Sequence, residues 1–189
     1  DSSKLEQVIL SGLLHDMGKL NLPERLLFFK EDFSVEEALE YKRHPIYSYE
    51  KIKEYKEIDR EISKAVLAHH ERCDGSGYPL NIKMEDMTTL TKILGLVDEY
   101  ERLRKFYHIF DIVRILKGDN LKKFDINILT KFCENIISYY IGAYVRLNTS
   151  EEAEVVFIHS HCLHRPIVKV KDAYIDLYNN PSIKIEEIL

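Results

Sequence analysis

Apolar residues recur at helical spacing through most of the chain before Gly142. The first set predicts a helix that ends near Lys19 and carries on one face Leu5, Val8, Ile9 and Leu13. A capping box of Ser34 and Glu37 marks the start of a second helix, which we expect to kink or restart at Pro45. The pattern predicts further helices over 58–70, 87–105, 108–117 and 126–139.

The period of the pattern changes from helical to alternating after Gly142. Alternation begins at Tyr144, and the segments 154–159 and 166–170 are further runs rich in β-forming residues. We therefore expect a mainly α protein, with a helical bundle over 1–140 and a small antiparallel β-meander over 141–189 that packs on it.

The composition is that of an ordinary globular protein, with 45% hydrophobic and 31% charged residues in a chain of 189. A net charge of −5 argues against binding to a nucleic-acid polymer. No apolar run approaches the roughly 20 residues of a membrane span, and no signal peptide is visible. The three cysteines form no CxxC pair, which favours reduced thiols and a soluble, cytoplasmic protein. Because the first residue is Asp1 and not Met, we expect a processed, trimmed or excised chain.

Two pairs of adjacent residues are candidates for metal binding. His15 precedes Asp16, and His69 precedes His70 at the end of an apolar helix. Neighbouring helical residues diverge by about 100°, so two adjacent histidines suit two different ions of a multinuclear site. Each pair also has an ordinary interpretation, the first as a chance dipeptide and the second as one hydrogen-bonded core histidine beside one exposed histidine.

Two single residues extend the candidate set. His44 precedes Pro45, and by itself suits a surface or capping position. Asp98 lies on an apolar helix face, where a carboxylate is costly unless it binds a cation or hydrogen-bond donors, or sits at a solvated edge. Imidazole and carboxylate ligands without thiolate suit iron, manganese or zinc.

Two motifs in this set resemble a known family. The segment His15-Asp16-Met17-Gly18-Lys19 looks like the HDxGK segment of HD-superfamily metal-dependent phosphohydrolases. The eleven residues from His69 to Pro79 fill every fixed position of HHExxDGxGYP, the signature of the HD-GYP family. The resemblance extends from Leu10 to about Val170 and includes the C-terminal β segment.

The resemblance implies an HD-domain helical bundle and a phosphodiesterase that hydrolyses cyclic di-GMP, a bacterial second messenger, to pGpG and often on to GMP. It implies two or three divalent metal ions, usually iron or manganese, whose ligands would be His15, Asp16, His44, His69, His70 and Asp98. Asp16 would bridge two metals, and Lys19 would contact the substrate phosphate. The loop Gly77-Tyr78-Pro79 would lie near the substrate, and such loops are associated with docking of a diguanylate cyclase or another signalling domain.

Some positions depart from the family pattern. Ser48 stands where the family has glycine. Lys92 stands where it has an arginine, which keeps the charge but loses the bidentate grip on a phosphate, and we retain Lys92 as a substrate-binding candidate. The family also carries a histidine, often with a glutamate, on a helix before the HD pair, and we expect those ligands to have been cut off from this chain.

Two other functions remain open: a catalytically weak HD-GYP module that binds a partner, and an HD phosphohydrolase that acts on another nucleotide. The phosphodiesterase hypothesis requires the six candidate ligands to converge on one pocket that holds metals about 3.5–4 Å apart. A separate group of residues suits zinc by type, but we interpret it as a solvated hairpin loop: His159, His161, Cys162 and His164.

Overall fold

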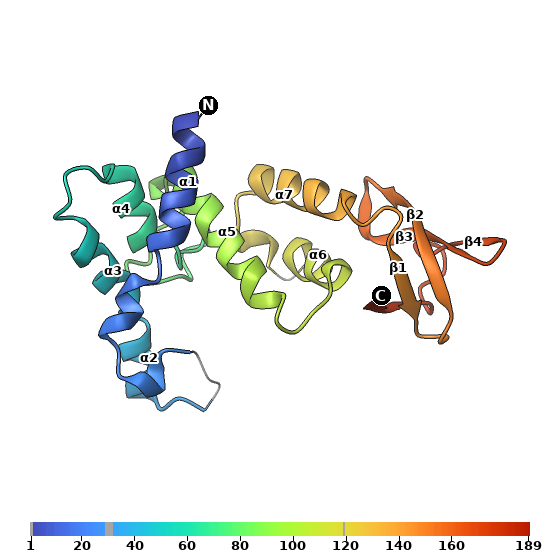
Figure 1. Cartoon of the computed structure of the whole chain (residues 1–189), viewed down its shortest axis with the longest axis horizontal. Coiled ribbons are helices and arrows are strands. Elements are labelled where there is room, and N and C mark those ends of the chain that lie inside the picture. The colour runs from blue at the N-terminus through green and yellow to red at the C-terminus, as the bar shows by residue number, and fades with distance from the viewer. Residues whose placement is uncertain (1, 29–31, 119) are drawn as a thin grey trace. The chain divides into compact units, whose positions relative to one another are not determined.

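The computed structural model describes residues 2–28, 32–118 and 120–189 (Figure 1). Its contacts divide the chain into two compact units. The first unit contains the residues up to Glu99 together with Lys122–Asp125, and the second contains Tyr100–Leu121 and Ile126–Leu189. The division falls inside the helix α5 (Thr89–Leu103), whereas the predicted domains meet at residue 140.

The first unit is helical. It is built from α1 (Ser2–Leu14), α2 (Val35–Tyr41), α3 (His44–Ile52), α4 (Arg60–Leu67) and the start of α5, with 3-10 helices at Met17–Asn21, Glu24–Leu26 and Met84–Asp86. The capping box is confirmed, because Ser34 Oγ accepts from the Glu37 amide and the Glu37 carboxylate accepts from the Ser34 amide. The break at Pro45 is also confirmed, since this proline lies in the first turn of α3.

The predicted end of the first helix is wrong. The α1 helix ends at Leu14, and a 3-10 helix begins at Met17. His15 and Asp16 therefore lie in the connection between the two helices. The cause is a contact from elsewhere in the sequence: the amide of Gly18 donates to Ser48 Oγ at 2.7 Å instead of to a carbonyl of its own helix. The connection places His15 and Asp16 against α3.

The helix predicted over 58–70 also ends earlier than expected. The α4 helix ends at Leu67, so His69 and His70 lie just past its C-terminus. The carbonyl of His69 accepts a hydrogen bond from Arg72 Nη1 at 3.2 Å, which satisfies a group that a helix would otherwise use. Freed from helical geometry, the two imidazoles can turn to the same side.

A small hydrophobic core holds these segments together. Ile52 of α3 and Ile62 and Val66 of α4 are buried, and Leu10 and Leu14 of α1 pack against them. Val8 of α1 is half-buried, and three other apolar side chains of this helix are exposed: Leu5, Ile9 and Leu13. The core therefore fixes α3 and α4, which carry or precede three of the candidate histidines, beside the end of α1.

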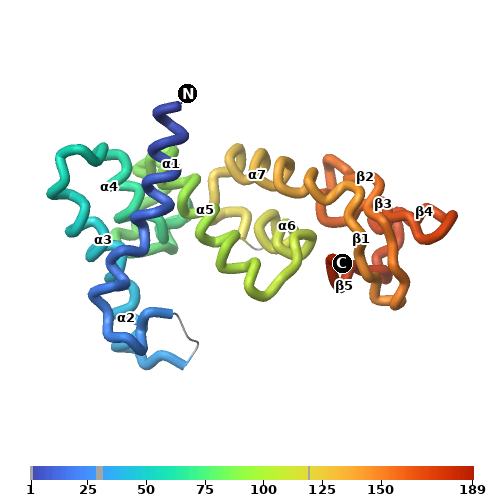
Figure 2. Tube along the Cα trace, in the orientation of Figure 1, coloured from blue at the N-terminus to red at the C-terminus, as the bar shows by residue number. Residues whose placement is uncertain are grey.

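The second unit combines the end of α5 with α6 (Ile109–Lys117), α7 (Ile126–Ser138) and a five-stranded antiparallel sheet. The strands are β1 (Tyr144–Leu147), β2 (Glu152–His159), β3 (Cys162–Val170), β4 (Ala173–Asp176) and β5 (Ile185–Ile188). Their order is β4-β3-β2-β1-β5, and α6 packs against β3 and α7 (Figure 2). The β-meander is confirmed, and β4 and β5 are edge strands that the periodicity did not predict.

The mainly α fold with a C-terminal antiparallel sheet is therefore as expected. No helix among the described residues combines the length and the apolarity that crossing a membrane requires.

Candidate metal centre

The six candidate ligands converge on one place in the first unit. His15 and Asp16 follow α1, His44 begins α3, His69 and His70 follow α4, and Asp98 lies on α5. Two groups of three have ligand atoms that all lie within 4.8 Å of one another, and they share His69: His44, His69 and His70, and His15, Asp16 and His69.

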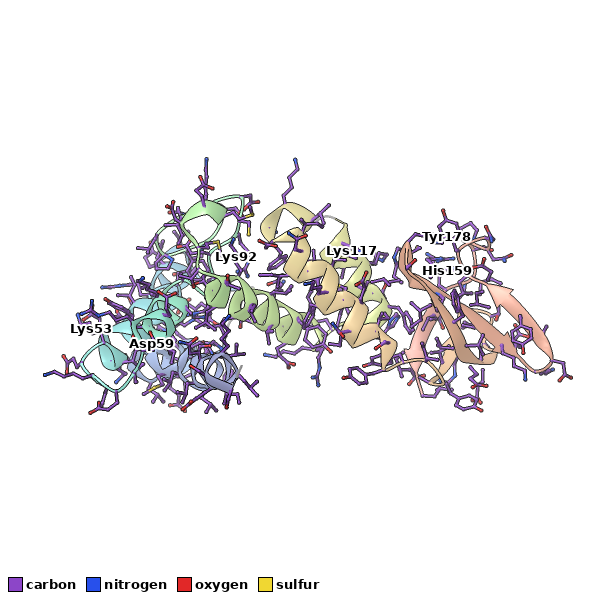
Figure 3. All side chains as sticks on the ribbon, turned by 90° about the horizontal axis from the view of Figure 1, so that it is seen from above. Lys53, Asp59, Lys92, Lys117, His159 and Tyr178 are labelled. Atoms are coloured by element: carbon purple, nitrogen blue, oxygen red, sulfur yellow. The ribbon has the colours of Figure 1, made fainter. Side chains whose placement is uncertain are left out.

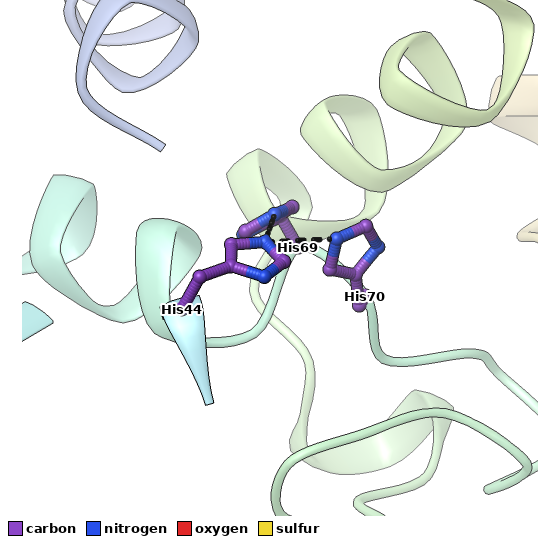
Figure 4. Close-up of side chains that lie close together, drawn as sticks. All are labelled: His44, His69 and His70. Atoms are coloured by element: carbon purple, nitrogen blue, oxygen red, sulfur yellow. Dashed lines mark hydrogen bonds between the residues drawn. The ribbon is translucent and has the colours of Figure 1, made fainter. Parts of the chain in front are cut away.

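The first group is a buried cluster of imidazoles. His44 and His69 are completely buried, and their Nε2 atoms lie 3.4 Å apart. His70 Nε2 lies 3.2 Å from His44 Nε2 (Figure 4). Asp16 Oδ1 faces the same point, 3.4 Å from His44 Nε2 and 4.0 Å from His69 Nε2.

In the second group, His15 lies close to Asp98 as well as to Asp16. His15 Nε2 lies 3.5 Å from Asp16 Oδ2 and 3.9 Å from Asp98 Oδ1. His70 Nδ1 lies 3.3 Å from Asp98 Oδ2. Each carboxylate thus meets at least two histidines, and the two oxygens of Asp16 face different ones, which is the arrangement a bridging carboxylate requires.

Backbone hydrogen bonds fix how three of these rings are turned. The Nδ1 atoms of His15, His44 and His69 each lie 2.7 Å from the carbonyl three residues earlier, at Gly12, Tyr41 and Val66. Nδ1–H donates to each carbonyl, so the lone pair of each Nε2 points into the cluster. The three histidines are therefore oriented as ligands by their own local backbone.

Burial keeps the cluster histidines neutral. It lowers the pKa of His44 to about 4, and it lowers the pKa of His69 and His70 below the ordinary value as well. Burial alone would raise the pKa of Asp16, but the charges of His15 and Lys19 outweigh it and hold this pKa below its usual value. Burial raises the pKa of Asp98. At neutral pH the imidazoles of His44, His69 and His70 are therefore in the neutral form that binds metals.

The residues present fit a divalent cation. Asp16 Oδ1 is buried and has no hydrogen-bond partner among the described residues. It faces Nε2 atoms that carry lone pairs, so acceptor atoms oppose one another at distances of 3.2–4.0 Å. Such an arrangement is unfavourable unless a cation lies between the acceptors. The donor set of imidazole nitrogen and carboxylate oxygen, without thiolate, suits iron, manganese or zinc.

Comparison with known proteins agrees with this geometry. The sequence model of the HD domain family matches residues 1–111. The chain belongs to the HD domain family. Cyclic di-GMP phosphodiesterase PA4108 of Pseudomonas aeruginosa is 28% identical over 167 residues, which cover 85% of this chain and 40% of that protein. Cyclic di-GMP phosphodiesterase PdeB of Borreliella burgdorferi is 31% identical over 154 residues, which cover 78% of this chain and 40% of that protein.

The HD domain fold has a counterpart among solved structures. Bd1817 from Bdellovibrio bacteriovorus, described as a HDG"Y"P protein, superposes with a TM-score of 0.62 at 24% identity, over 72% of this chain and 45% of that chain. At this identity the likeness supports the fold alone. The chain spans about 40% of the length of the two curated relatives. The complete signature at 69–79 resembles that of the HD-GYP branch of this family.

The loop at the end of the HD-GYP signature folds back on His70, which lies at the start of the same signature. The amide of Tyr78 donates to the carbonyl of His70 at 3.2 Å, and the Tyr78 ring stacks on the His70 ring with centroids 4.6 Å apart. Gly77 lies so close to the backbone of Glu71 that a side chain would overlap it. The signature tyrosine is thus part of the wall that holds a candidate ligand.

Glu71 fastens the other end of the loop. Its carboxylate is buried, and Oε1 accepts from the amides of Leu80 and Asn81 at 2.5 and 3.1 Å. This residue belongs to the signature, but sequence reasoning gave it no role. Its Oε1 fixes the loop by hydrogen bonding, and its Oε2 is buried without a hydrogen-bond partner among the described residues.

Ser48 is a second residue whose role the sequence did not reveal. Its buried hydroxyl accepts from the Gly18 amide at 2.7 Å and donates to the His15 carbonyl at 2.6 Å. A side chain on Gly18 would overlap the carbonyl of His44. Ser48 therefore ties the HD segment to α3, which carries His44. The departure from the family's glycine is the signal that the sequence offered.

The two candidate lysines lie in different surroundings. Lys19 Nζ donates to Asp16 Oδ2 at 2.6 Å and lies over the Tyr41 ring, 5.5 Å from its centroid. Burial opposes the charge of Lys19, but the Asp16 carboxylate outweighs it and raises the pKa. Lys92 Nζ instead lies 3.4 Å from Asp125 Oδ2. A contact of Lys92 with substrate stays a prediction.

The second histidine group belongs to the sheet of the second unit. His159 ends β2 and Cys162 begins β3, and His159 Nε2 lies 3.0 Å from Asp176 Oδ1 (Figure 3). The predicted hairpin is confirmed, with Ser160 and His161 forming its turn. The expectation of a solvated loop is correct for His161 alone, because His159, Cys162 and His164 lie in the paired strands and are partly buried. Within the described residues, the groups of ligand atoms close enough for one ion are the two in the first unit.

Proposed function

We propose that this HD-GYP chain is a metal-dependent phosphodiesterase that hydrolyses cyclic di-GMP to pGpG, with further hydrolysis to GMP as a second step of the same chemistry. The supporting observation is the clustering of ligand atoms of His15, Asp16, His44, His69 and His70, which come from separate segments, with Asp98 beside His15 and His70 and with a buried, unpartnered oxygen on Asp16. The names of PA4108 and PdeB support cyclic di-GMP as the substrate.

His15, Asp16, His44, His69, His70 and Asp98 would hold two divalent metal ions, iron or manganese, with Asp16 between them. When bound, such ions lower the pKa of a water molecule and stabilise negative charge on phosphoryl oxygens. The protein contributes imidazoles whose orientation is set by backbone hydrogen bonds, and two of them, His44 and His69, are completely buried. No side chain has to act as a nucleophile.

Lys19 is the cation that we expect to contact the phosphate. Its ammonium is held at 2.6 Å from Asp16, at the edge of the ligand cluster. Its raised pKa keeps it charged at neutral pH, and a fixed positive charge stabilises the charge that develops on a phosphate during hydrolysis. Lys92, paired with Asp125, would add a more distant positive charge on the same unit.

The Gly77-Tyr78-Pro79 loop would border the substrate and a docking partner. The Tyr78 ring stacks on His70, and Lys42 Nζ lies over the Tyr78 ring, 5.6 Å from its centroid. The next residue after the loop, Leu80, is 54% exposed. A diguanylate cyclase or another signalling domain that docks here would contact the exposed Leu80. Tyr78 would link that contact to the metal centre, because its ring stacks on His70.

Substitution of Lys19 by glutamine tests the enzymatic proposal. In protein reconstituted with manganese or iron, cyclic di-GMP turnover measured by chromatography should fall by about a hundredfold, because one preorganised charge is lost. Metal content at saturating metal should be unchanged. The exposed Lys56→Gln should retain full turnover, as a control for loss of charge.

Two outcomes would contradict the proposal. Metal binding without turnover of cyclic di-GMP by the parent chain would indicate a partner-binding module. Turnover of linear nucleotides alone would indicate an HD phosphohydrolase with another substrate.

A further inference from the structure

A cavity of about 380 Å³ lies in the second unit, lined by residues of α6, β3 and the C-terminal segment. Its apolar surface comes from Phe110, Leu177 and Ile185, all of which are buried. Its volume lies within the range of about 300–1,000 Å³ that is usual for small-molecule sites. The cavity shares no residue with the metal centre of the first unit.

Arg165 places a half-buried positive charge in this cavity wall. Its Nε and Nη2 atoms donate to the carbonyls of Leu177, Asn180 and Ile183 at 2.6–3.0 Å. Those contacts hold the guanidinium rigidly but leave its charge without a counterion. Within the described ranges, no carboxylate lies within ion-pair distance of Arg165.

The other charged groups of the cavity add to this positive charge. Arg114 and Lys184 both line it, and the single acidic residue there is Asp111. Asp111 is already shared between two partners, with Oδ1 at 3.2 Å from Arg114 Nε and Oδ2 at 3.1 Å from His108 Nε2. The three cations Arg114, Arg165 and Lys184 therefore exceed this carboxylate by two positive charges.

His164 lies in the same wall and responds to these charges. Burial lowers its pKa, and the nearby Arg165 and Arg114 lower it further. At neutral pH its ring is therefore an uncharged hydrogen-bonding group inside a positive environment. The cavity thus brings three cations, a neutral histidine and an apolar floor together in one partly open space.

We propose that this cavity binds a small anion that carries a phosphate group. A phosphate with close to two negative charges matches this excess of two positive charges, whereas a single carboxylate would balance only one of them. The planar guanidinium of Arg114 can engage two oxygens of one phosphate, and Lys184 adds a point charge beside it. The proposal stands apart from the hydrolytic function, because none of its residues belongs to the metal centre.

Calorimetric titration with inorganic pyrophosphate and with inorganic phosphate tests the proposal. The full chain carrying Asp16→Asn is used after metal removal and dialysis away from chelator, so that phosphate cannot bind at the metal centre. We expect saturable binding that Arg114→Gln and Lys184→Gln each weaken by about tenfold or more, because each removes a charged hydrogen bond. Lys131→Gln, an exposed change on α7, should leave the affinity unaltered.

A carboxylate probe defines the ligand class. Succinate should bind at least about tenfold more weakly than pyrophosphate, since it cannot offer the same density of charge to the two cations. Absence of saturable phosphate binding would overturn the proposal. Equal affinity in Arg114→Gln, Lys184→Gln and Lys131→Gln would overturn it too, as would succinate binding as tightly as pyrophosphate.

Discussion

Replacing Asp16 by asparagine is expected to remove both metal binding and hydrolysis. Asp16 is the residue whose two oxygens face different histidines, with Oδ1 at 3.4 Å from His44 Nε2 and Oδ2 at 3.5 Å from His15 Nε2. Asparagine keeps the shape but has no negative charge and only one oxygen, so it cannot bridge two cations. Losing the several kcal/mol that metal ions supply should lower turnover by about a thousandfold or more.

The measurement combines metal content by elemental analysis with cyclic di-GMP turnover. Asp172→Asn, an exposed change in the turn before β4, removes the same charge far from any candidate ligand in the sequence and should alter neither quantity. Circular dichroism establishes that Asp16→Asn is folded. If that variant were folded and retained its metal and its turnover, Asp16 would not be a bridging ligand.

Adding a methyl group at Gly77 is expected to damage the metal centre without touching a ligand. A Cβ at this position would overlap the backbone of Glu71, Arg72 and His70 at once, and backbone cannot move aside as a flexible side chain can. The loop would have to shift, taking Tyr78 off the His70 ring. Gly77→Ala should therefore lower the free energy of unfolding by about 3 kcal/mol or more and weaken metal binding.

Gly12 provides the matched control for this substitution. It lies in α1, and a Cβ there would meet no heavy atom within 4 Å. Gly12→Ala should raise the free energy of unfolding by about 0.5–1 kcal/mol, because alanine favours helix over glycine. Denaturant unfolding and metal titration of both variants give the comparison. Equal stability and equal metal affinity in the two would mean that the loop does not support His70.

The ligands could be predicted from the sequence because the motifs that carry them are local. His15-Asp16 and His69-His70 are each contiguous, and the complete signature from His69 to Pro79 is far longer than chance would produce. The structure shows why this signature is unbroken, since Glu71, Gly77 and Tyr78 contact the histidines or the loop itself. Local sequence and local structure coincide here.

What escaped prediction depends on contacts between distant segments. The end of α1 is set by Ser48, thirty residues away from Gly18 along the chain, and no periodicity encodes that hydrogen bond. The strand β5 forms because Ile185 and Ile188 reach the free edge of β1, which is a property of the assembled sheet. The helices α6 and α7 group with the sheet because α6 packs on β3.

Anomalous X-ray diffraction from crystals of the manganese-loaded protein tests the central claim most directly. The expected result is two peaks about 3.5–4 Å apart, in contact with ligand atoms of His15, Asp16, His44, His69, His70 and Asp98. A protein that takes up manganese but shows no peak among these residues, with the metal lying at other side chains such as His159 and Asp176, would contradict the claim that the six residues form one metal centre.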